Sequence, residues 1–380
     1  MNVILTLNAG SSSIKFAAYL DAAEPQLLQA GQVENLGPVA RLVLKGEAGE
    51  DIGPADHAAA IPAILRALDP VLQGRKVAGV GHRIVHGGKT FGAPVRISDD
   101  VLTQLRAFIP LAPLHQPHNL AAMRAAAVAF PESVQVGCFD TSFHKGHPFV
   151  NDTFGLPRRF YDQGVRRYGF HGLSYDYITS CLRRDWPDLA RGRVVIAHLG
   201  NGASMCAVRD GRSIGSTMGF SALDGLVMGT RCGQLDPGVL LYLMNQGLDV
   251  DEITRILYHE SGLKGLSELS HDMRILLASD DHKAKEAIDY YVFRIQRELG
   301  AMAAVLGGLD GVVFCGGVGE NAAEIRDRVI DGMGFLGLAL DPQANSSGAT
   351  RIGTGAAEVM IIHTDEEQVI ARAVAKELAV

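Results

Sequence analysis

The chain has 380 residues, of which 47% are hydrophobic and 20% are charged, and its formal net charge is −7. At about 150 residues per domain, this length predicts roughly two domains, and the composition excludes wholesale disorder. Because 42 acidic side chains outnumber 35 basic ones and no long basic run occurs, neither a nucleic-acid partner nor an anionic membrane surface is expected.

No segment predicts export or membrane insertion. The N-terminal apolar run lacks a basic region before it and stops at Asn8, which argues against a signal peptide. The long apolar run from Gly300 is interrupted at Asp310, before it reaches the length of a membrane span. The five cysteines are scattered without a CxxC pair, so neither a disulfide framework nor a cysteine zinc site is indicated. We therefore expect a cytoplasmic protein.

Two strand–turn–strand units lie about half a chain apart. Residues 3–7 form an apolar run, 8–12 a turn of small residues, and 14–20 an alternating second strand. The same layout returns with strands over 194–197 and 205–208 around a turn at 200–204. Gly10 aligned with Gly202 gives an offset of 202 − 10 = 192 residues, which indicates duplication of one unit, with coincidence as the alternative.

Helices and further strands alternate through the rest of the chain, which favours an α/β architecture. Apolar spacing predicts helices over 99–109, stopped by Pro110, over 119–130, and over a long stretch that ends at Gly307. A capping box of Thr364 and Glu367 is predicted to start the last helix. Strands are predicted over 134–139 and 312–315.

Three glycine-rich turns follow apolar strands, at 8–13, 198–202 and 316–321. Glycine lets the backbone approach an anion and expose its N–H groups, so three such turns together favour a polyphosphate site over three ordinary tight turns. None matches GxxxxGK[ST], which excludes a P-loop. Residues 317–322 satisfy GxGxxA, the dinucleotide fingerprint, but they come too late in the chain to head a full dinucleotide-binding half.

Basic and imidazole groups stand among glycines at three places: Arg83 within 81–88, His171 within 168–172, and Arg231 within 228–233. A guanidinium group fits carboxylate or phosphate oxygens, with a structural ion pair as the alternative for each arginine. Asp140 follows a strand, and Glu366 opens the last helix, where a simple helix-dipole role is also possible. Metal binding by the histidine pairs 82/86, 115/118 and 144/147 is disfavoured, since neither HExxH nor a zinc spacing is present.

These motifs together resemble the acetate kinase family. The matching stretches run in order from end to end of the chain: NAGSSSIKF at 8–16, GHRIVHGG at 81–88, LAPLH at 111–115, FDTSFH at 139–144, YGFHG at 168–172, HLGNG at 198–202, MGTR at 228–231 with Asp236-Pro237, GGVGEN at 316–321 and TDEE at 364–367.

The resemblance implies a duplicated two-domain fold of the acetate and sugar kinase, heat-shock chaperone and actin superfamily, with a nucleotide cleft between the domains. The expected lobes are 1–147 plus 365–380, and 148–364, the second one binding ATP and forming the dimer. The implied reaction is reversible phosphoryl transfer from ATP to the carboxylate of a short fatty acid, most simply acetate. Mg²⁺ is the implied cofactor, with Mn²⁺ possible, and a homodimer is the implied assembly.

Residue roles also follow from the resemblance alone. Arg83 and Arg231 would contact the carboxylate and the phosphoryl group, His171 would stabilise the transferring phosphoryl, and Asp140 would be the catalytic carboxylate. Asn8 and Glu366 would hold the metal. Val85, Leu114 and Phe170, with Ala222, would form the acyl pocket. The ATP site would comprise Lys15, His198, Leu199, Gly200, Asn201, Gly202, Asp272, Met273, Arg274, Gly317, Val318, Gly319, Glu320 and Asn321; Ser11, Ser13 and His115 match further active-site positions.

The chain departs from the family pattern in one place that bears on specificity. Ala222 stands where the family usually has proline in the acyl pocket, which leaves a propionate- or butyrate-preferring kinase as an alternative. Three further functions stay open at this point: a sugar kinase of the same superfamily, an ATP-dependent clamp and an NAD dehydrogenase. The paired arginines and the apolar pocket argue against the sugar kinase.

Overall fold

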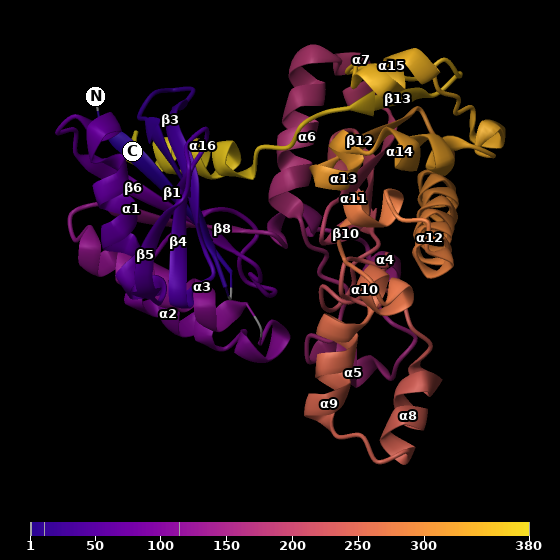
Figure 1. Cartoon of the computed structure of the whole chain (residues 1–380), viewed down its shortest axis with the longest axis horizontal. Coiled ribbons are helices and arrows are strands. Elements are labelled where there is room, and N and C mark those ends of the chain that lie inside the picture. Colours follow the sequence, from indigo (N-terminus) through magenta and orange to yellow (C-terminus); the bar gives the residue numbers. More distant parts are fainter. Residues whose placement is uncertain (1, 11, 114, 380) are drawn as a thin grey trace. The chain divides into compact units, whose positions relative to one another are not determined.

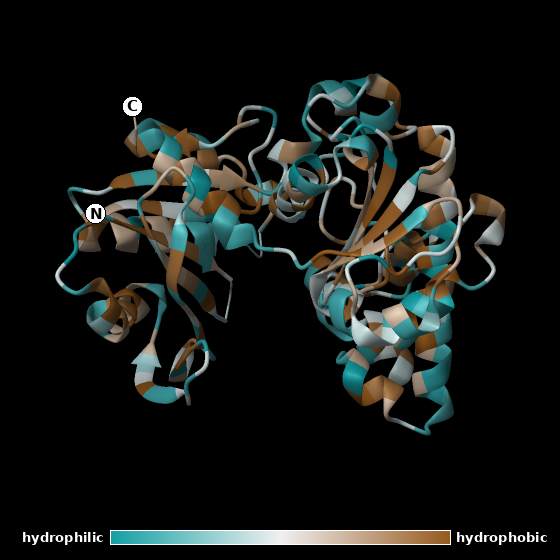
Figure 2. Cartoon of the chain, turned by 90° about the horizontal axis from the view of Figure 1, so that it is seen from above, coloured by the Kyte–Doolittle hydropathy of each residue, from teal (hydrophilic) through white to brown (hydrophobic). Residues whose placement is uncertain are grey.

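The computed structural model describes residues 2–10, 12–113 and 115–379. The chain divides into two compact units, an N-terminal unit of Met1–Phe143 with Asp365–Val380 and a C-terminal unit of His144–Thr364 (Figure 1). In each, hydrophobic residues concentrate on the strands and hydrophilic ones on the outer surfaces of the helices (Figure 2).

The N-terminal unit holds eight strands and four longer helices in its described residues. The strands are β1 (Val3–Ala9), β2 (Ile14–Leu20), β3 (Gln26–Glu34), β4 (Gly37–Leu44), β5 (Glu50–Ala55), β6 (Val77–Ile84), β7 (Val95–Arg96) and β8 (Val134–Phe139). The helices are α1 (His57–Leu72), α2 (Asp99–Arg106), α3 (Gln116–Ala129) and α16 (Glu366–Leu378), with short 3₁₀ turns η1 (Ile109–Leu111) and η2 (Ser142–His144).

One mixed sheet, in the order β5-β4-β3-β2-β1-β6-β8-β7, organises this unit. β1, β6 and β8 run parallel, and β2 pairs antiparallel with β1. Val80 of β6 faces the core that α1 and α3 cover. Its neighbours Gly79 and Gly81 face α16 instead, since a Cβ at either would lie within 2.5 Å of a Val374 or Ile370 side chain. The two glycines therefore let the last helix pack directly on the sheet.

The C-terminal unit holds a second mixed sheet and most of the helices. Its strands are β9 (Arg193–Leu199), β10 (Ala203–Arg209), β11 (Arg212–Ser216), β12 (Gly311–Cys315) and β13 (Glu358–Ile361). Its helices are α4 (Phe149–Asp152), α5 (Arg158–Asp162), α6 (Gly172–Asp185), α7 (Pro187–Ala190), α8 (Pro237–Asn245), α9 (Val250–Arg255), the π-helical turn η3 (Ile256–Glu260), α10 (Gly262–Ser267), α11 (Met273–Leu277), α12 (His282–Leu306), α13 (Gly316–Asn321), α14 (Ala323–Ile330), η4 (Gly334–Leu336) and α15 (Pro342–Ser347).

Both units share one topology. The second sheet has the order β11-β10-β9-β12-β13, with β9, β12 and β13 parallel. The same pattern occurs in the first sheet as β3-β2-β1-β6-β8. Each central strand, β1 or β9, therefore continues through a short turn into an antiparallel neighbour. The duplication and the α/β class expected from the sequence are confirmed.

Two predicted local structures are wrong, namely the end of one helix and one glycine-rich turn. The helix predicted to reach residue 109 ends at Arg106, because the ring of Pro110 would clash with the Arg106 carbonyl, and residues 109–111 form a 3₁₀ turn instead. The third glycine-rich turn, at 316–321, is not a loop. Helix α13 begins there directly after β12, with Gly316 in the left-handed region at φ 76°.

The predicted capping box of Thr364 and Glu367 is also wrong. Asp365 caps α16 instead, by accepting a hydrogen bond of 2.9 Å from the Gln368 N–H. The Thr364 hydroxyl lies 2.8 Å from Ser174 Oγ, and the Thr364 N–H donates to the Glu320 carboxylate at 3.0 Å. A sequence pattern identified the helix start within two residues, but tertiary partners drew Thr364 away from the cap.

Across residues 2–10, 12–113 and 115–379, no helix combines the length and the apolar character that crossing a bilayer requires.

Acidification is expected to destabilise the fold well above the carboxylate range. Burial lowers the pKa of His82 and of His86 to about 4, and that of His144 to about 3. Below pH 6.5 the unfolded chain binds protons at these side chains and the folded chain does not, so stability falls as the pH drops from about 6.5 toward 4. Each histidine contributes up to about 1.4 kcal/mol per pH unit inside that window.

Urea unfolding at pH 8, 7, 6 and 5 measures this effect. The unfolding free energy should change little between pH 8 and 7 and fall steeply below 6.5, and His82→Gln should lower the steepness by about one proton. An equal slope above and below pH 6.5 would contradict the assignment of these neutral histidines.

Candidate active site

Polar side chains gather at the carboxyl ends of the parallel strands of the N-terminal unit. Asn8 is the next-to-last residue of β1, Arg83 the next-to-last residue of β6, and Asp140 the first residue after β8. Because the three strands are parallel, these positions share one edge of the sheet. Lys15, in the antiparallel neighbour β2, is the residue that faces Asn8 in the β1–β2 pairing. Binding sites of α/β sheets lie at this edge.

Arg83 holds two carboxylates at that edge. Its Nη2 lies 2.7 Å from Asp140 Oδ2 and its Nε 3.0 Å from Oδ1, while its Nη1 lies 3.1 Å from Glu366 Oε2. The Asp140 side chain is 3% exposed and that of Arg83 is 19% exposed. Burial acts to lower the pKa of Arg83, but the carboxylates of Asp140 and Glu366 outweigh it and hold that pKa above its ordinary value.

Asn119 is a buried side chain at this edge of the sheet that the sequence did not single out. This buried side chain of α3 donates from Nδ2 to the Ala9 carbonyl at 2.9 Å and accepts at Oδ1 from the Val85 N–H at 3.1 Å. It therefore joins the chain just after Asn8 to the chain just after Arg83. The only feature of the sequence that could have indicated this role is a polar asparagine within an otherwise alanine-rich helix.

In the C-terminal unit, the predicted catalytic side chain His171 lies directly before helix α6. It precedes α6 with φ 57°, a left-handed conformation that an ordinary residue seldom adopts. Its Nδ1 lies 2.8 Å from the buried Ser204 Oγ, and the Tyr175 hydroxyl contacts the same oxygen. Ser204 and Tyr175 were missed from the sequence. Together they fix the orientation of the His171 ring.

His198 lies against His171. Their rings stack with centroids 4.4 Å apart and planes inclined by 23°. His198 Nδ1 lies 2.8 Å from Ser174 Oγ, which in turn lies 2.8 Å from the Thr364 hydroxyl. Thr364 and His198, which are far apart in the sequence, thus share one serine at the carboxyl ends of β9 and β13.

The turn that carries Arg231 is fixed by the segment after it. The Met228 N–H donates to the Arg231 carbonyl at 3.1 Å, and the Leu263 N–H donates to the Met228 carbonyl at 2.8 Å. Arg231 Nη1 donates to the Ala222 carbonyl at 2.7 Å. A Cβ added to Gly202 would lie 2.7 Å from Arg231 Nη2 and 3.2 Å from His171 Nε2, so both side chains converge on the 198–202 turn.

The predicted ATP-site residues occupy several places. Leu199, Gly200, Asn201 and Gly202 end β9 or follow it, while Gly317, Val318, Gly319, Glu320 and Asn321 lie in α13 after the parallel strand β12. Met273 is buried at the start of α11.

Three of these side chains have structural partners. The Glu320 carboxylate accepts from the Gly316 and Thr364 N–H groups at 2.9 and 3.0 Å, and it lies 2.8 Å from His363 Nδ1. Asp272 caps α11 and pairs with Arg274 at 2.5 Å, so its carboxylate has a local structural role. Their role at a nucleotide stays a prediction.

The acyl-pocket residues belong to different units. Val85 lies in the N-terminal unit, whereas Phe170, which is 2% exposed, and Ala222 lie in the C-terminal unit. Leu114 falls outside the described residues, as does Ser11. Their common pocket therefore stays a prediction.

The oxygen donors of the N-terminal edge suit a magnesium ion. Mg²⁺ prefers carboxylate and carbonyl oxygens and takes only one or two carboxylates beside substrate phosphates. Asp140, Glu366 and the Asn8 amide supply that kind of donor, and in the ranges 2–10, 12–113 and 115–379 no group of three or more acidic, cysteine or histidine side chains is arranged to hold a metal ion by itself. The donor set therefore fits a metal that is shared with a phosphate ligand.

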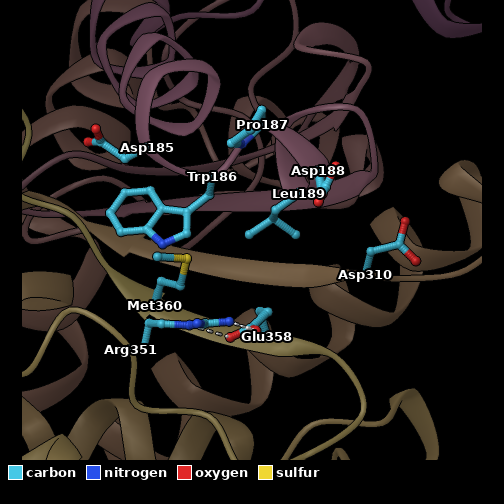
Figure 3. A pocket seen from close by; sticks show the side chains of 9 residues that line it. All are labelled: Asp185, Trp186, Pro187, Asp188, Leu189, Asp310, Arg351, Glu358 and Met360. Carbon is cyan, nitrogen blue, oxygen red and sulfur yellow. Dashed lines mark hydrogen bonds and ion pairs between the residues drawn. The ribbon is translucent and has the colours of Figure 1, made fainter.

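A separate pocket lies at the opposite edge of the C-terminal sheet. Trp186, Leu189 and Met360 face one another there, and Arg351 pairs with Glu358 (Figure 3). Glu358 begins β13, so this pocket is at the amino ends of the parallel strands. It contains none of the predicted site residues, and its arginine and glutamate neutralise each other.

The duplicated α/β topology, with histidine and arginine side chains at the carboxyl ends of its parallel strands, defines a two-unit α/β protein whose polar groups lie where such folds bind their ligands. The model of the acetokinase family matches residues 3–372, and the chain belongs to that family.

Relatives support this over nearly the whole length. An acetate kinase of Methylocella silvestris is 54% identical, covering 97% of this chain and 96% of the relative, and one of Rhodopseudomonas palustris is 50% identical over 98% and 97%. The fold is similar to a propionate kinase of Francisella tularensis (TM-score 0.92, 36% identity, 98% and 99% covered) and to the acetate kinase of Porphyromonas gingivalis (TM-score 0.90, 36% identity, both chains fully covered).

Proposed function

We propose that this chain catalyses the reversible transfer of the terminal phosphoryl group of ATP to acetate, giving acetyl phosphate and ADP. The observation that carries the proposal is the concentration of basic groups at two strand edges, Arg83 in one unit and His171 with Arg231 in the other. Relatives named acetate kinase, at 54% and 50% identity, support acetate as the acid.

The chemistry of the reaction matches these residues. Acetate is already ionised at neutral pH, so the nucleophile needs no general base. The obstacle is the approach of one anion to another, and phosphoryl transfer passes through a loose transition state whose charge is spread over oxygens. Guanidinium and imidazole groups answer that obstacle by neutralising charge and aligning the reactants. Arg83 and Arg231 would orient the carboxylate and the phosphoryl group, and His171 would donate to a phosphoryl oxygen.

Asp140, Asn8 and Glu366 would hold Mg²⁺ together with the triphosphate, either directly or through water. When bound, such an ion neutralises phosphate charge and orients the phosphoryl group. Asp140 is then a ligand and an anchor for Arg83 rather than a proton acceptor. Lys15 and the turns at 198–202 and 317–321 would surround the phosphates.

A hydroxamate assay tests the reaction. Purified protein, ATP and Mg²⁺ are incubated with formate, acetate, propionate or butyrate, and acyl phosphate is trapped with hydroxylamine. We expect hydroxamate from acetate, with propionate as a poorer substrate, since each methylene changes transition-state binding by only about 1–3 kcal/mol. Absence of hydroxamate with every acid would refute the proposal. ADP formation with sugars but not with acids would favour a sugar kinase, and a nicotinamide absorbance change a dehydrogenase.

The homodimer of the family is also proposed here, through helix α8. None of the residues of this helix is buried within the chain, although most are apolar. Leu241 and Tyr242 are 62% and 61% exposed, and Met244 is 49% exposed. Exposed apolar surface of this kind is typical of a protein–protein interface.

Light scattering on a gel-filtration column tests this interface. The wild type should elute at twice the mass of one chain, and Leu241→Asp with Tyr242→Asp should elute as monomer. A dimer that persists in this double variant would place the interface elsewhere.

The cytoplasm is the proposed compartment, since scattered cysteines without a disulfide pattern suit a reducing environment.

A further inference from the structure

A partly buried chain of hydrogen bonds leads to the residue before His171 in the C-terminal unit. Its centre is Ser213 of β11, whose hydroxyl lies 2.9 Å from His144 Nδ1 and 2.8 Å from His147 Nε2. At one end His147 Nδ1 lies 3.4 Å from the Asp152 carboxylate, and at the other His144 Nε2 lies 2.9 Å from the Phe170 carbonyl. We call this set of residues 152, 147, 213, 144 and 170 the Ser213 chain.

The carbonyl at its end fixes the direction of these hydrogen bonds. The Phe170 oxygen can only accept, so His144 Nε2 carries a proton. Burial lowers the pKa of His144 to about 3, and the ring is therefore neutral, with Nδ1 as an acceptor. Ser213 must then donate its proton to His144, and His147 Nε2 must donate to Ser213. The Phe170 carbonyl and the Ser213 hydroxyl therefore favour the same tautomer of His144, and together they fix the orientation of its ring.

Two routes connect this ring to His171. Phe170 directly precedes His171, so the Nε2–H bond holds the peptide that leads into the left-handed residue. The ring also packs on Gly169, where φ is 73° and a Cβ would lie 2.5 Å from the imidazole carbons. The His144 ring also meets Tyr175 edge-on, with ring centroids 5.6 Å apart, and the Tyr175 hydroxyl shares Ser204 with His171.

The structure assigns Ser213 and His144 as positioning residues for phosphoryl transfer: we propose that the Ser213 chain fixes the Phe170 carbonyl and, through it, the backbone and ring orientation of His171. This inference rests on the proposed function and extends it to Ser213 and His144, which lie outside the predicted ligand contacts. The histidines at 144 and 147 thus share a serine hydroxyl, and the metal pair considered from their spacing is not required.

Kinetics of Ser213→Ala test the assignment. Loss of the hydroxyl removes the donor to His144 Nδ1, so only the Phe170 carbonyl still holds the ring by a hydrogen bond of this chain, and the ring and the peptide at Phe170 are less firmly fixed. We expect kcat to fall about tenfold while KM for ATP and for acetate changes less than about twofold, at the lower end of the 10–100-fold effect of the hydrogen-bond partners that orient metal-bound histidines. Ser213→Thr, which keeps a hydroxyl, should stay within about threefold of the wild type.

Ser216→Ala is the matched control on the same strand. Its hydroxyl is buried without a hydrogen-bond partner among the described residues, so its removal should leave kcat unchanged. In a His171→Ala background, Ser213→Ala should lower kcat by less than about twofold more, because a residue that acts through His171 has nothing left to position. Imidazole ¹⁵N shifts of His171 should also move in Ser213→Ala.

The outcomes separate the two proposals. A wild type without acetyl phosphate formation refutes the proposed function itself. An active wild type with Ser213→Ala at full kcat, or with reduced kcat but unmoved His171 shifts, overturns the positioning role, as does an equal loss in Ser213→Thr. Should Ser213→Ala not fold, His147→Gln, at the far end of the chain, is measured in the same way with the same criteria.

Discussion

Arg231→Ala should lower kcat by about 10²–10³-fold while the affinity for ATP changes less than about threefold. The expected size is that of one lost donor to a charge that develops in the transition state. Arg231 is held for such a role, since its backbone is fixed through Met228 and Leu263 and its Nη1 is anchored on the Ala222 carbonyl. Its Nη2 converges with His171 Nε2 beside Gly202, and both groups are proposed to act on the transferred phosphoryl group, so the loss should affect transfer more than binding of the rest of the nucleotide.

Initial rates for the hydroxamate product, together with ADP and ATP titration by calorimetry, measure the two quantities separately. Arg328→Ala is the control, since this arginine pairs with Asp289 at the surface of the same unit and surface pairs contribute about 0–1 kcal/mol. An equal loss of ATP affinity and kcat in Arg231→Ala would assign the arginine to nucleotide binding.

Arg83→Met and Asp140→Asn should each abolish most activity and destabilise the N-terminal unit. Arg83→Met leaves the carboxylates of Asp140 and Glu366 without the cation they share, and breaking a buried ion pair from one side costs about 3–5 kcal/mol. Asp140→Asn should cost less, because Arg83 keeps Glu366 as a partner. We expect kcat to fall by at least about 10²-fold in both variants.

Urea unfolding of both single variants and the double variant measures the coupling. The double variant should be less destabilised than the sum of the single ones, by about 1–3 kcal/mol, since the two groups are in contact. Glu132→Gln, which removes the exposed partner of Lys76, should leave the free energy of unfolding nearly unchanged, because water screens surface ion pairs. Additive effects of Arg83→Met and Asp140→Asn would mean that the ion pair between the two side chains has no coupling energy in the folded state.

Much of the scaffold was predictable because local physics determines it. Alternation identified β2, the apolar run identified β1, and Gly307 ends the long helix α12 in the left-handed conformation expected of a terminal glycine. The strand predicted at 134–139 is β8. The errors lie at element ends: Pro110 shortened α2, and Asp365 rather than Thr364 caps the last helix.

The candidate site was predictable only in part. The motifs named Arg83, Asp140, His171 and Arg231, whereas the serines that orient the histidines were missed. A serine carries no periodic signal, and its partner is set by the fold: Ser174 contacts Thr364 at a separation of 190 residues, and Ser213 contacts His144 at 69. Such contacts exist only after the strands have paired.

By itself, the sequence determined the two-fold repeated α/β plan, the positions of its principal strands and helices, and the family, because hydrophobic period and glycine placement act over a few neighbouring residues. The tertiary structure alone decided which polar groups meet: Arg83 between Asp140 and Glu366, His171 on Ser204, and His144 and His147 on one hydroxyl. These contacts depend on strand register and on helix packing over long separations, and no local pattern records either.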